Sequence, residues 1–225
     1  MTEFTDELAI SDLTLDELRP VLVDALLNHV PFDGWTQAAL ARAAEDLGIP
    51  ENRAELVFPG GAVDMVDAFI ARVDAQMSEQ LAALDLPSMK IRERIRTAVR
   101  TRLEVSAPHR EAIRRAISIL ALPQNAARGT RILWRSVDEM WRAAGDTATD
   151  YNYYTKRATL AGVYSSTLLV WLDDESEALS ETWGFLDRRI ESVMRFEKTK
   201  ARVQKISANR PSLSRFLGRL RYPAA

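Results

Sequence analysis

The spacing of apolar residues is the feature that most restricts the fold of this 225-residue chain. Apolar residues recur three and four positions apart along nearly the whole length, and runs of β-branched residues with a period of two are missing. The first pattern is typical of amphipathic helices, whereas strands would need the second. Prolines and glycines interrupt the pattern at intervals that suit helices of ordinary length. The sequence therefore predicts an all-α protein.

Local start and stop signals place the expected helices. Thr14 and Glu17 have the form of a capping box, which predicts a helix from 14 to about 30, and Pro31, Asp33 and Gly34 are expected to end it. Thr36 is expected to begin a second helix, and Gly48 to end it. Further helices are expected over 50–58, 62–84, 88–106, 108–121, 124–144, 151–172, 178–206 and 211–220.

Charge is distributed unevenly, although the formal net charge is only −2. Residues 1–86 contain 17 acidic and 4 basic residues, a formal charge of −13. Residues 188–225 contain 2 acidic and 11 basic residues, a formal charge of +9. This asymmetry indicates different partners at the two ends. The absence of cysteine excludes disulfides and thiolate zinc sites.

The first three predicted helices have the spacing of a helix-turn-helix module. Small residues of the second helix would let two helices cross closely, with an inward face of Ala38, Leu40, Ala41 and Ala44. With the turn at 59–61, this arrangement resembles the N-terminal module of TetR-type regulators, which implies a TetR-like fold.

DNA binding is not favoured for this module. The expected third helix, 50–58, holds two Glu and one Arg within an acidic segment. Phosphate neutralisation by Lys and Arg supplies most non-specific DNA affinity, so the local charge opposes binding. A TetR-like scaffold without a nucleic-acid partner is the interpretation, and a TetR-type transcriptional regulator with a lipophilic effector is the alternative.

Three tyrosines stand at the start of the expected helix 151–172. At about 100° per residue, Tyr151, Tyr153 and Tyr154 spread over more than half of the helix circumference, so they cannot all face one core. Some should be exposed near Arg157, and exposed aromatics beside arginine are typical of interface anchors. Half-buried rings with hydroxyls in solvent remain the alternative.

Residues 150–164, preceded by Trp141, resemble the COQ9 family of lipid-binding accessory proteins of ubiquinone (coenzyme Q) biosynthesis, and the resemblance extends over about 14–196. The missing transit peptide suggests a bacterial member. The resemblance implies a homodimer formed through 151–172 and 178–198. It also implies a surface that docks a ubiquinone-biosynthesis hydroxylase, formed by Tyr151, Tyr153, Tyr154 and Arg157.

The same resemblance implies a cavity for a polyisoprenoid quinone precursor or another lipid. The candidates are apolar residues of the middle helices, which by pattern alone are equally compatible with an ordinary core. They are Leu133, Trp134, Val137, Met140, Trp141, Leu168 and Leu169.

A basic segment followed by a short amphipathic stretch stands near the end of the chain. Its apolar residues recur at i, i+3, i+4 and i+7 and are flanked by arginines, which is typical of a helix at a membrane surface. Docking on the protein's own body is the alternative. The expected membrane-binding residues are Leu213, Arg215, Phe216, Leu217, Arg219 and Leu220.

No catalytic constellation is recognisable in the sequence. His29 and His109 are the only histidines, and neither follows a Glu by three positions, so the Glu-x-x-His pattern of helical di-iron sites is absent. The acidic stretch 173–177 is interpreted as a helix cap. We therefore expect a non-enzymatic protein with no catalytic residues, no cofactor and no metal site.

The expected location follows from two further patterns. The N-terminal residues are acidic, unlike a secretory or mitochondrial targeting segment. The longest apolar stretch, 158–172, is short for a membrane span. We expect a cytoplasmic protein at the inner-membrane surface, with a module over 1–86, a lipid-binding and dimerisation body over 87–206, and a linker with a membrane helix over 207–225.

Overall fold

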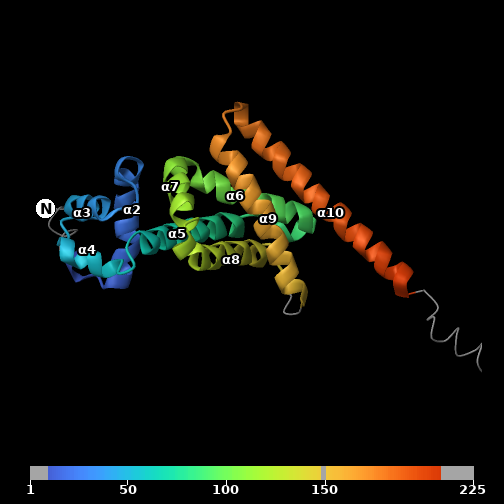
Figure 1. The fold of residues 1–225 in the computed structure, drawn as a ribbon, viewed down its shortest axis with the longest axis horizontal. Coiled ribbons are helices and arrows are strands. Elements are labelled where there is room, and N and C mark those ends of the chain that lie inside the picture. Colours follow the sequence, from blue (N-terminus) through green and yellow to red (C-terminus); the bar gives the residue numbers. More distant parts are fainter. Residues whose placement is uncertain (1–9, 148–150, 209–225) are drawn as a thin grey trace, which may run out of the picture. The chain divides into compact units, whose positions relative to one another are not determined.

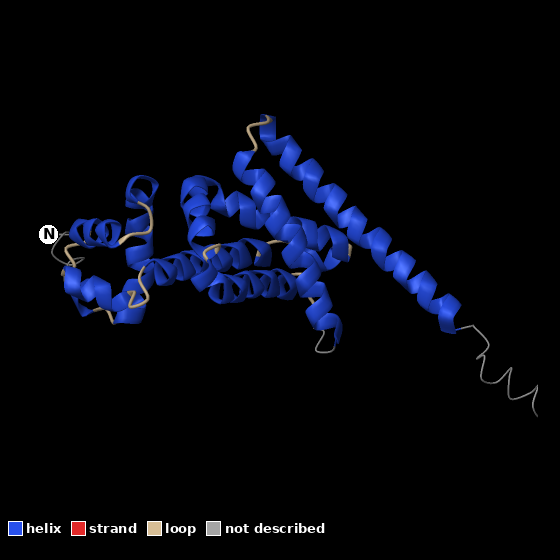
Figure 2. Ribbon diagram, in the orientation of Figure 1, coloured by secondary structure: helices blue, strands red, loops and turns tan. Residues whose placement is uncertain are grey.

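The computed structural model describes residues 10–147 and 151–208, with side chains at 10–147 and 152–196. Within these ranges every regular element is a helix and no strand occurs (Figure 2), which confirms the predicted all-α fold. Figure 1 shows the longer helices in chain order: α2 (Leu15–Asp33), α3 (Gln37–Asp46), α4 (Glu51–Val57), α5 (Ala62–Ala82), α6 (Ile91–Ser106), α7 (Arg110–Leu120), α8 (Ala126–Ala143), α9 (Tyr151–Asp173) and α10 (Ser180–Ala208). Short 3-10 turns lie between them: η1 (Leu86–Ser88), η2 (Ala107–His109), η3 (Pro123–Asn125) and η4 (Glu177–Leu179).

The capping box at the start of α2 is confirmed. The Thr14 backbone N–H donates to Glu17 Oε2 at 2.8 Å, and the Glu17 N–H donates to Thr14 Oγ1 at 3.3 Å. The helix continues past the expected last residue, about 30, and ends at Asp33. Proline already has a helical φ and only lacks one donor. The residue that stops the helix is Gly34, one of the expected breaking residues, which has a φ of +71° and bonds back to Val30.

The inward face of α3 differs by one position from the expected face. Leu40 and Ala44 are buried as predicted, but Ala38 is exposed and Ala39 is buried in its place. Thr36 caps the helix by accepting from the Ala39 N–H at 3.2 Å, which confirms its predicted role. The cap fixes where the helix begins, and the contact with α2 selects which face turns inward.

Helix α5 belongs both to the N-terminal module and to the body. It contacts α2 of the module, and it also contacts α6, α7 and α8 of the body (Figure 1). Its Phe69 ring lies 5.2 Å from the buried ring of Trp35, whose Nε1 donates to the Ala112 carbonyl at 3.0 Å. Trp35 thereby links the module to both α5 and α7, and Arg115 of α7 adds a direct bond from its Nη2 to the Pro31 carbonyl at 2.9 Å.

Residues up to Leu186 form one compact unit, and those from Asp187 on form a second, so α10 crosses the boundary.

The acidic stretch before α10 caps that helix: Asp174 accepts from the Ser176 and Thr182 backbone N–H groups, both at 2.8 Å. Burial opposes the Asp174 charge, but these bonds and those of the two hydroxyls hold the pKa of Asp174 well below its usual range. In the part of the chain that the structure describes, no helix is both long and apolar enough to cross a bilayer.

Candidate functional site

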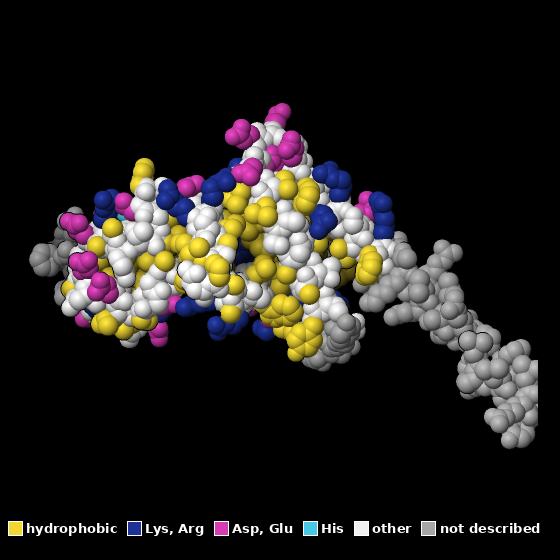
Figure 3. Space-filling view, in the orientation of Figure 1, with side chains coloured by type: hydrophobic (Ala, Val, Ile, Leu, Met, Phe, Trp, Pro, Cys, Tyr) yellow, Lys and Arg dark blue, Asp and Glu magenta, His cyan; other side chains and the backbone are white. Residues whose placement is uncertain are grey.

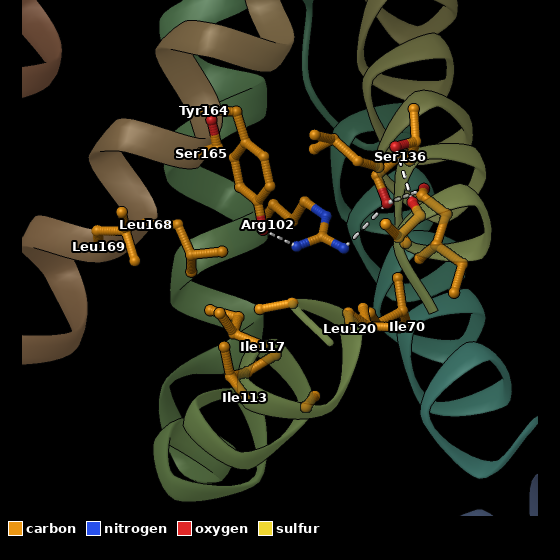
Figure 4. Close-up of a pocket in the computed structure, with 17 residues that line it drawn as sticks. Ile70, Arg102, Ile113, Ile117, Leu120, Ser136, Tyr164, Ser165, Leu168 and Leu169 are labelled. Carbon is orange, nitrogen blue, oxygen red and sulfur yellow. Dashed lines mark hydrogen bonds between the residues drawn. The ribbon is translucent and has the colours of Figure 1, made fainter. Parts of the chain in front are cut away.

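A cavity of about 420 Å³ lies among helices α5 to α9, and its wall is mostly apolar (Figure 4). It opens to the surface, because Leu169 lines it and is still 56% exposed. Figure 3 shows hydrophobic side chains around a hollow between α7 and α9. The apolar wall includes Ile70 of α5, Ile113, Ile117 and Leu120 of α7, Leu133 of α8, and Leu168 and Leu169 of α9.

A buried polar network forms one end of this cavity. Arg102 of α6 is 2% exposed, and its Nε donates to Asp74 Oδ1 at 2.9 Å. Its Nη2 donates to Ser136 Oγ at 3.1 Å, and its Nη1 donates to the Tyr164 hydroxyl. Ser136 Oγ in turn donates to Asp74 Oδ2 at 2.8 Å. The network thus joins four helices, α5, α6, α8 and α9.

The network keeps one charged pair and one neutral phenol inside the body. Burial raises the pKa of the Tyr164 phenol, so the hydroxyl stays protonated at neutral pH. Burial acts against the charge of Arg102, but the adjacent Tyr164 and Asp74 oxygens outweigh it and raise the pKa of the guanidinium. The Arg102 guanidinium also lies 4.8 Å from the centre of the Tyr164 ring.

The structure brings three of the seven predicted pocket residues together at the cavity: Leu133, Leu168 and Leu169. Val137 and Met140 do not line it and are fully buried core residues. Trp134 and Trp141 also lie elsewhere, and the Trp141 ring centre is 5.4 Å from Lys156 Nζ. The face of α8 that lines the cavity carries Gly129, Leu133 and Ser136. The lining residues Arg102 of α6 and Tyr164 of α9 were not predicted from the sequence. The one sequence signal for Arg102 is a cation between Val99 and Leu103 on an apolar helix face.

A second candidate site is the aromatic surface formed by Trp134, Tyr153 and Tyr154. Trp134 lies 6.4 Å from Tyr153 and 6.2 Å from Tyr154 between ring centres, and the two tyrosine rings are 5.1 Å apart. Tyr154 is 61% exposed, which confirms that part of the tyrosine cluster faces solvent. Figure 3 shows hydrophobic side chains gathered where α9 begins. Tyr151 and all the predicted membrane-binding residues lie outside the residues whose side chains are described.

Arg157 lies beneath this aromatic surface and not on it. Its side chain is 2% exposed, its Nε donates to Asp138 Oδ1 at 2.5 Å, and its Nη1 donates to Asp146 Oδ2 at 2.9 Å. The Tyr153 ring centre is 3.5 Å from the guanidinium carbon, and the Tyr153 hydroxyl donates to Asp138 at 3.1 Å. Arg157 can therefore position Tyr153, but it presents no exposed guanidinium to a partner. This corrects the expected direct contact.

The third helix of the module, α4, contains one basic residue, Arg53, which bonds within the module. The Arg53 guanidinium donates to the Ser11 carbonyl at 2.8 Å and to the Leu13 carbonyl. Glu51 and Glu55 on the same helix are exposed. The helix therefore presents acidic side chains to solvent while its arginine fastens the preceding chain segment.

Comparison with known proteins places these sites in a family. The COQ9 family model matches residues 126–197, which include the aromatic surface and the α8 and α9 walls of the cavity. Over these residues the chain is similar to a COQ9 family domain. "Ubiquinone biosynthesis protein COQ9, mitochondrial" of Rattus norvegicus is 36% identical over 196 residues, 84% of this chain and 62% of that protein. The Homo sapiens protein of the same name is 34% identical over 196 residues, 84% of this chain and 61% of that protein. The chain thus spans about three fifths of the length of these COQ9 relatives.

A solved structure agrees with the predicted fold of this COQ9 homologue. A TetR transcriptional regulator from Nitrosomonas europaea ATCC 19718 superposes with a TM-score of 0.63, over 78% of this chain and 97% of that chain. The sequences are 21% identical, so this likeness concerns the fold alone. The TetR-like fold predicted from the helix-turn-helix spacing is confirmed.

Proposed function

We propose that this COQ9 homologue is a non-catalytic, lipid-binding accessory protein of ubiquinone biosynthesis. It takes a membrane-derived polyisoprenoid quinone precursor into the cavity among α5–α9 and presents it to a ubiquinone-modifying hydroxylase at the aromatic surface. The observation that carries the proposal is the mostly apolar cavity, about 420 Å³ in volume, in a relative of ubiquinone biosynthesis proteins. Cavities of this size and character are typical of small-molecule sites.

The physical task is to move a lipid from the bilayer to a water-soluble active site. Each methylene group removed from water stabilises the bound state by about 0.8 kcal/mol, so an apolar wall alone gives useful affinity for a tail. The proposal also includes reversible attachment to the cytoplasmic face of the inner membrane through the stretch 211–220, and a homodimer through 151–172 and 178–198. The aromatic surface supports partner docking, because exposed Tyr and Trp side chains are frequent interface anchors.

The alternative is a TetR-type regulator whose lipophilic effector occupies the same cavity. The TetR-like fold favours it, but the module carries a formal charge of −13 over 1–86, and the α4 arginine already bonds to backbone carbonyls. A mobility shift of the full chain with its own upstream DNA at low salt would support the regulator.

Lipid content of the purified full chain tests the main proposal. Leu169→Asp places a carboxylate at the cavity mouth, and we expect it to remove most co-purified quinone or isoprenoid, because the charge must be desolvated beside the lipid. Leu56→Asp is the matched control, since Leu56 is 65% exposed on α4 and does not line the cavity. Both side chains are largely exposed, so neither change should unfold the protein. Mass spectrometry of organic extracts gives the readout.

The outcomes separate clearly. Retained lipid in Leu56→Asp and lost lipid in Leu169→Asp would support the proposed cavity. A wild-type protein without any quinone or isoprenoid would contradict it. Equal lipid in both variants would mean that the lipid binds elsewhere on the chain.

A further inference from the structure

The cavity has an apolar mouth and a polar inner end. Leu169 at the mouth is 56% exposed, whereas Arg102 and Tyr164 at the inner end are 2% and 3% exposed. In Figure 4 the Tyr164 hydroxyl and the Arg102 guanidinium face one another. Ile117 and Leu120 lie on a different wall of the same cavity. A ligand that fills this space therefore meets a polar group at its buried end.

That inner end offers hydrogen-bond donors. The Tyr164 hydroxyl accepts from Arg102, and among the described residues its own hydrogen has no acceptor. Each Nη of Arg102 carries two hydrogens, and each Nη has one acceptor. The Ser136 hydroxyl is already directed at Asp74. A ligand atom at this place should therefore be an acceptor.

The charges around the inner end are balanced, so that acceptor should be neutral. Asp74 pairs with Arg102 and also faces Arg135 Nε at 3.7 Å. Arg135 pairs with Asp67 at 2.6 Å, and Arg128 pairs with Asp64 and Asp67. Three aspartates of α5 thus face three arginines of α6 and α8 (Asp64, Asp67 and Asp74 with Arg102, Arg128 and Arg135). An anionic ligand would lose its hydration without gaining an unbalanced positive charge.

We propose that Arg102 and Tyr164 form a specificity site that hydrogen-bonds a neutral carbonyl oxygen, so that a lipid enters carbonyl first and leaves its tail toward Leu169. This inference rests on the proposed lipid-binding function and deepens it by naming the ligand group and its direction. A quinone ring and an acyl ester share this chemistry, whereas a plain hydrocarbon leaves the donors unsatisfied.

Calorimetric titration of the delipidated full chain with three probes tests the inference. Decylbenzoquinone carries ring carbonyls, methyl laurate carries an ester carbonyl, and decylbenzene carries none. We expect wild type to bind decylbenzoquinone about tenfold more tightly than decylbenzene, as one or two hydrogen bonds would give. Tyr164→Phe should bind these two probes within about twofold of each other.

Ser165→Ala is the matched control for this experiment. Ser165 lines the same cavity, but its hydroxyl donates to the Ala161 carbonyl at 2.6 Å within its own helix. The control should keep the tenfold preference for decylbenzoquinone. Infrared spectra of ¹³C-carbonyl decylbenzoquinone give a second readout that needs only wild type: the bound carbonyl band should shift to lower frequency than in hexane.

Each outcome decides the inference. A preference for either carbonyl probe with a shifted band supports it, and the methyl laurate arm tells whether a ring or an ester carbonyl is favoured. Equal binding of decylbenzoquinone and decylbenzene by wild type, with an unshifted band, overturns the carbonyl site and leaves the lipid cavity standing. Failure of all three probes to bind overturns the lipid cavity itself.

Discussion

Asp74→Ala is expected to lower the free energy of unfolding by about 3–5 kcal/mol, the usual cost of leaving one member of a buried ion pair alone. The Asp74 and Arg102 side chains are 5% and 3% exposed. Removing the Asp74 carboxylate leaves the buried Arg102 guanidinium without its counter-charge. It also leaves the Ser136 hydroxyl without the carboxylate oxygen to which it donates. Urea denaturation followed by circular dichroism measures the change.

Two further variants identify the cause of that loss. Arg42→Ala breaks a pair with Asp33 in which Arg42 is 58% exposed, and we expect a loss below about 1 kcal/mol. The double variant Asp74→Leu with Arg102→Met should recover much of the stability, because no unpaired charge remains. An Asp74→Ala protein as stable as Arg42→Ala would refute the view of Asp74 as the counter-charge of the cavity.

Arg157→Ala is expected to reduce both stability and partner binding. Its charged hydrogen bonds to Asp138 and Asp146 suggest a loss of about 1.5–3 kcal/mol. The effect should be smaller than at Asp74, because Arg142 and Lys156 still pair with the two carboxylates at 2.8 and 2.6 Å. The Tyr153 ring also loses the cation on which it lies.

Comparison of Arg157→Ala with Tyr154→Ala distinguishes a residue that positions the aromatic surface from a residue that contacts the partner directly. Tyr154 is 61% exposed, so its removal should leave stability nearly unchanged and, if the proposed docking holds, weaken capture of the proposed hydroxylase partner about 30-fold or more, as at an aromatic hot spot. Phe32→Ala is the matched control, an 83% exposed aromatic on α2. Stability is measured by urea denaturation and capture by surface plasmon resonance. Normal capture by Tyr154→Ala would exclude the aromatic surface as the docking site.

Helix bounds were predictable because their signals are local. The Thr14 capping box and the Thr36 cap each lie within three residues of the backbone group they bond. Glycine at a positive φ marks the turns after α2 and α3, at Gly34 and Gly48. Of the three residues expected to end α2, Pro31 lies inside the last turn, because a proline there removes a donor without stopping the helix at once.

The cavity was only partly predictable, because it depends on contacts between distant parts of the chain. Arg102 meets residues 28, 34 and 62 positions away, and no local pattern reports such distances. Leu133 and Val137 both fit an apolar stripe on α8, but only the packing of α7 and α9 decides which one lines a cavity. The burial of Arg157 was hidden for the same reason, since Asp138 and Asp146 approach it from outside its own helix.

The double membership of α5 makes the cavity depend on the N-terminal module. One helix supplies Phe69 to the packing around Trp35 and, further along, Ile70 and Asp74 to the wall and counter-charge of the cavity. Deletion of α2 to α4 would uncover apolar residues of α5, such as Phe69, that are buried in the folded chain. The N-terminal module therefore supports the helix that supplies Ile70 and Asp74 to the cavity, whatever else the module does.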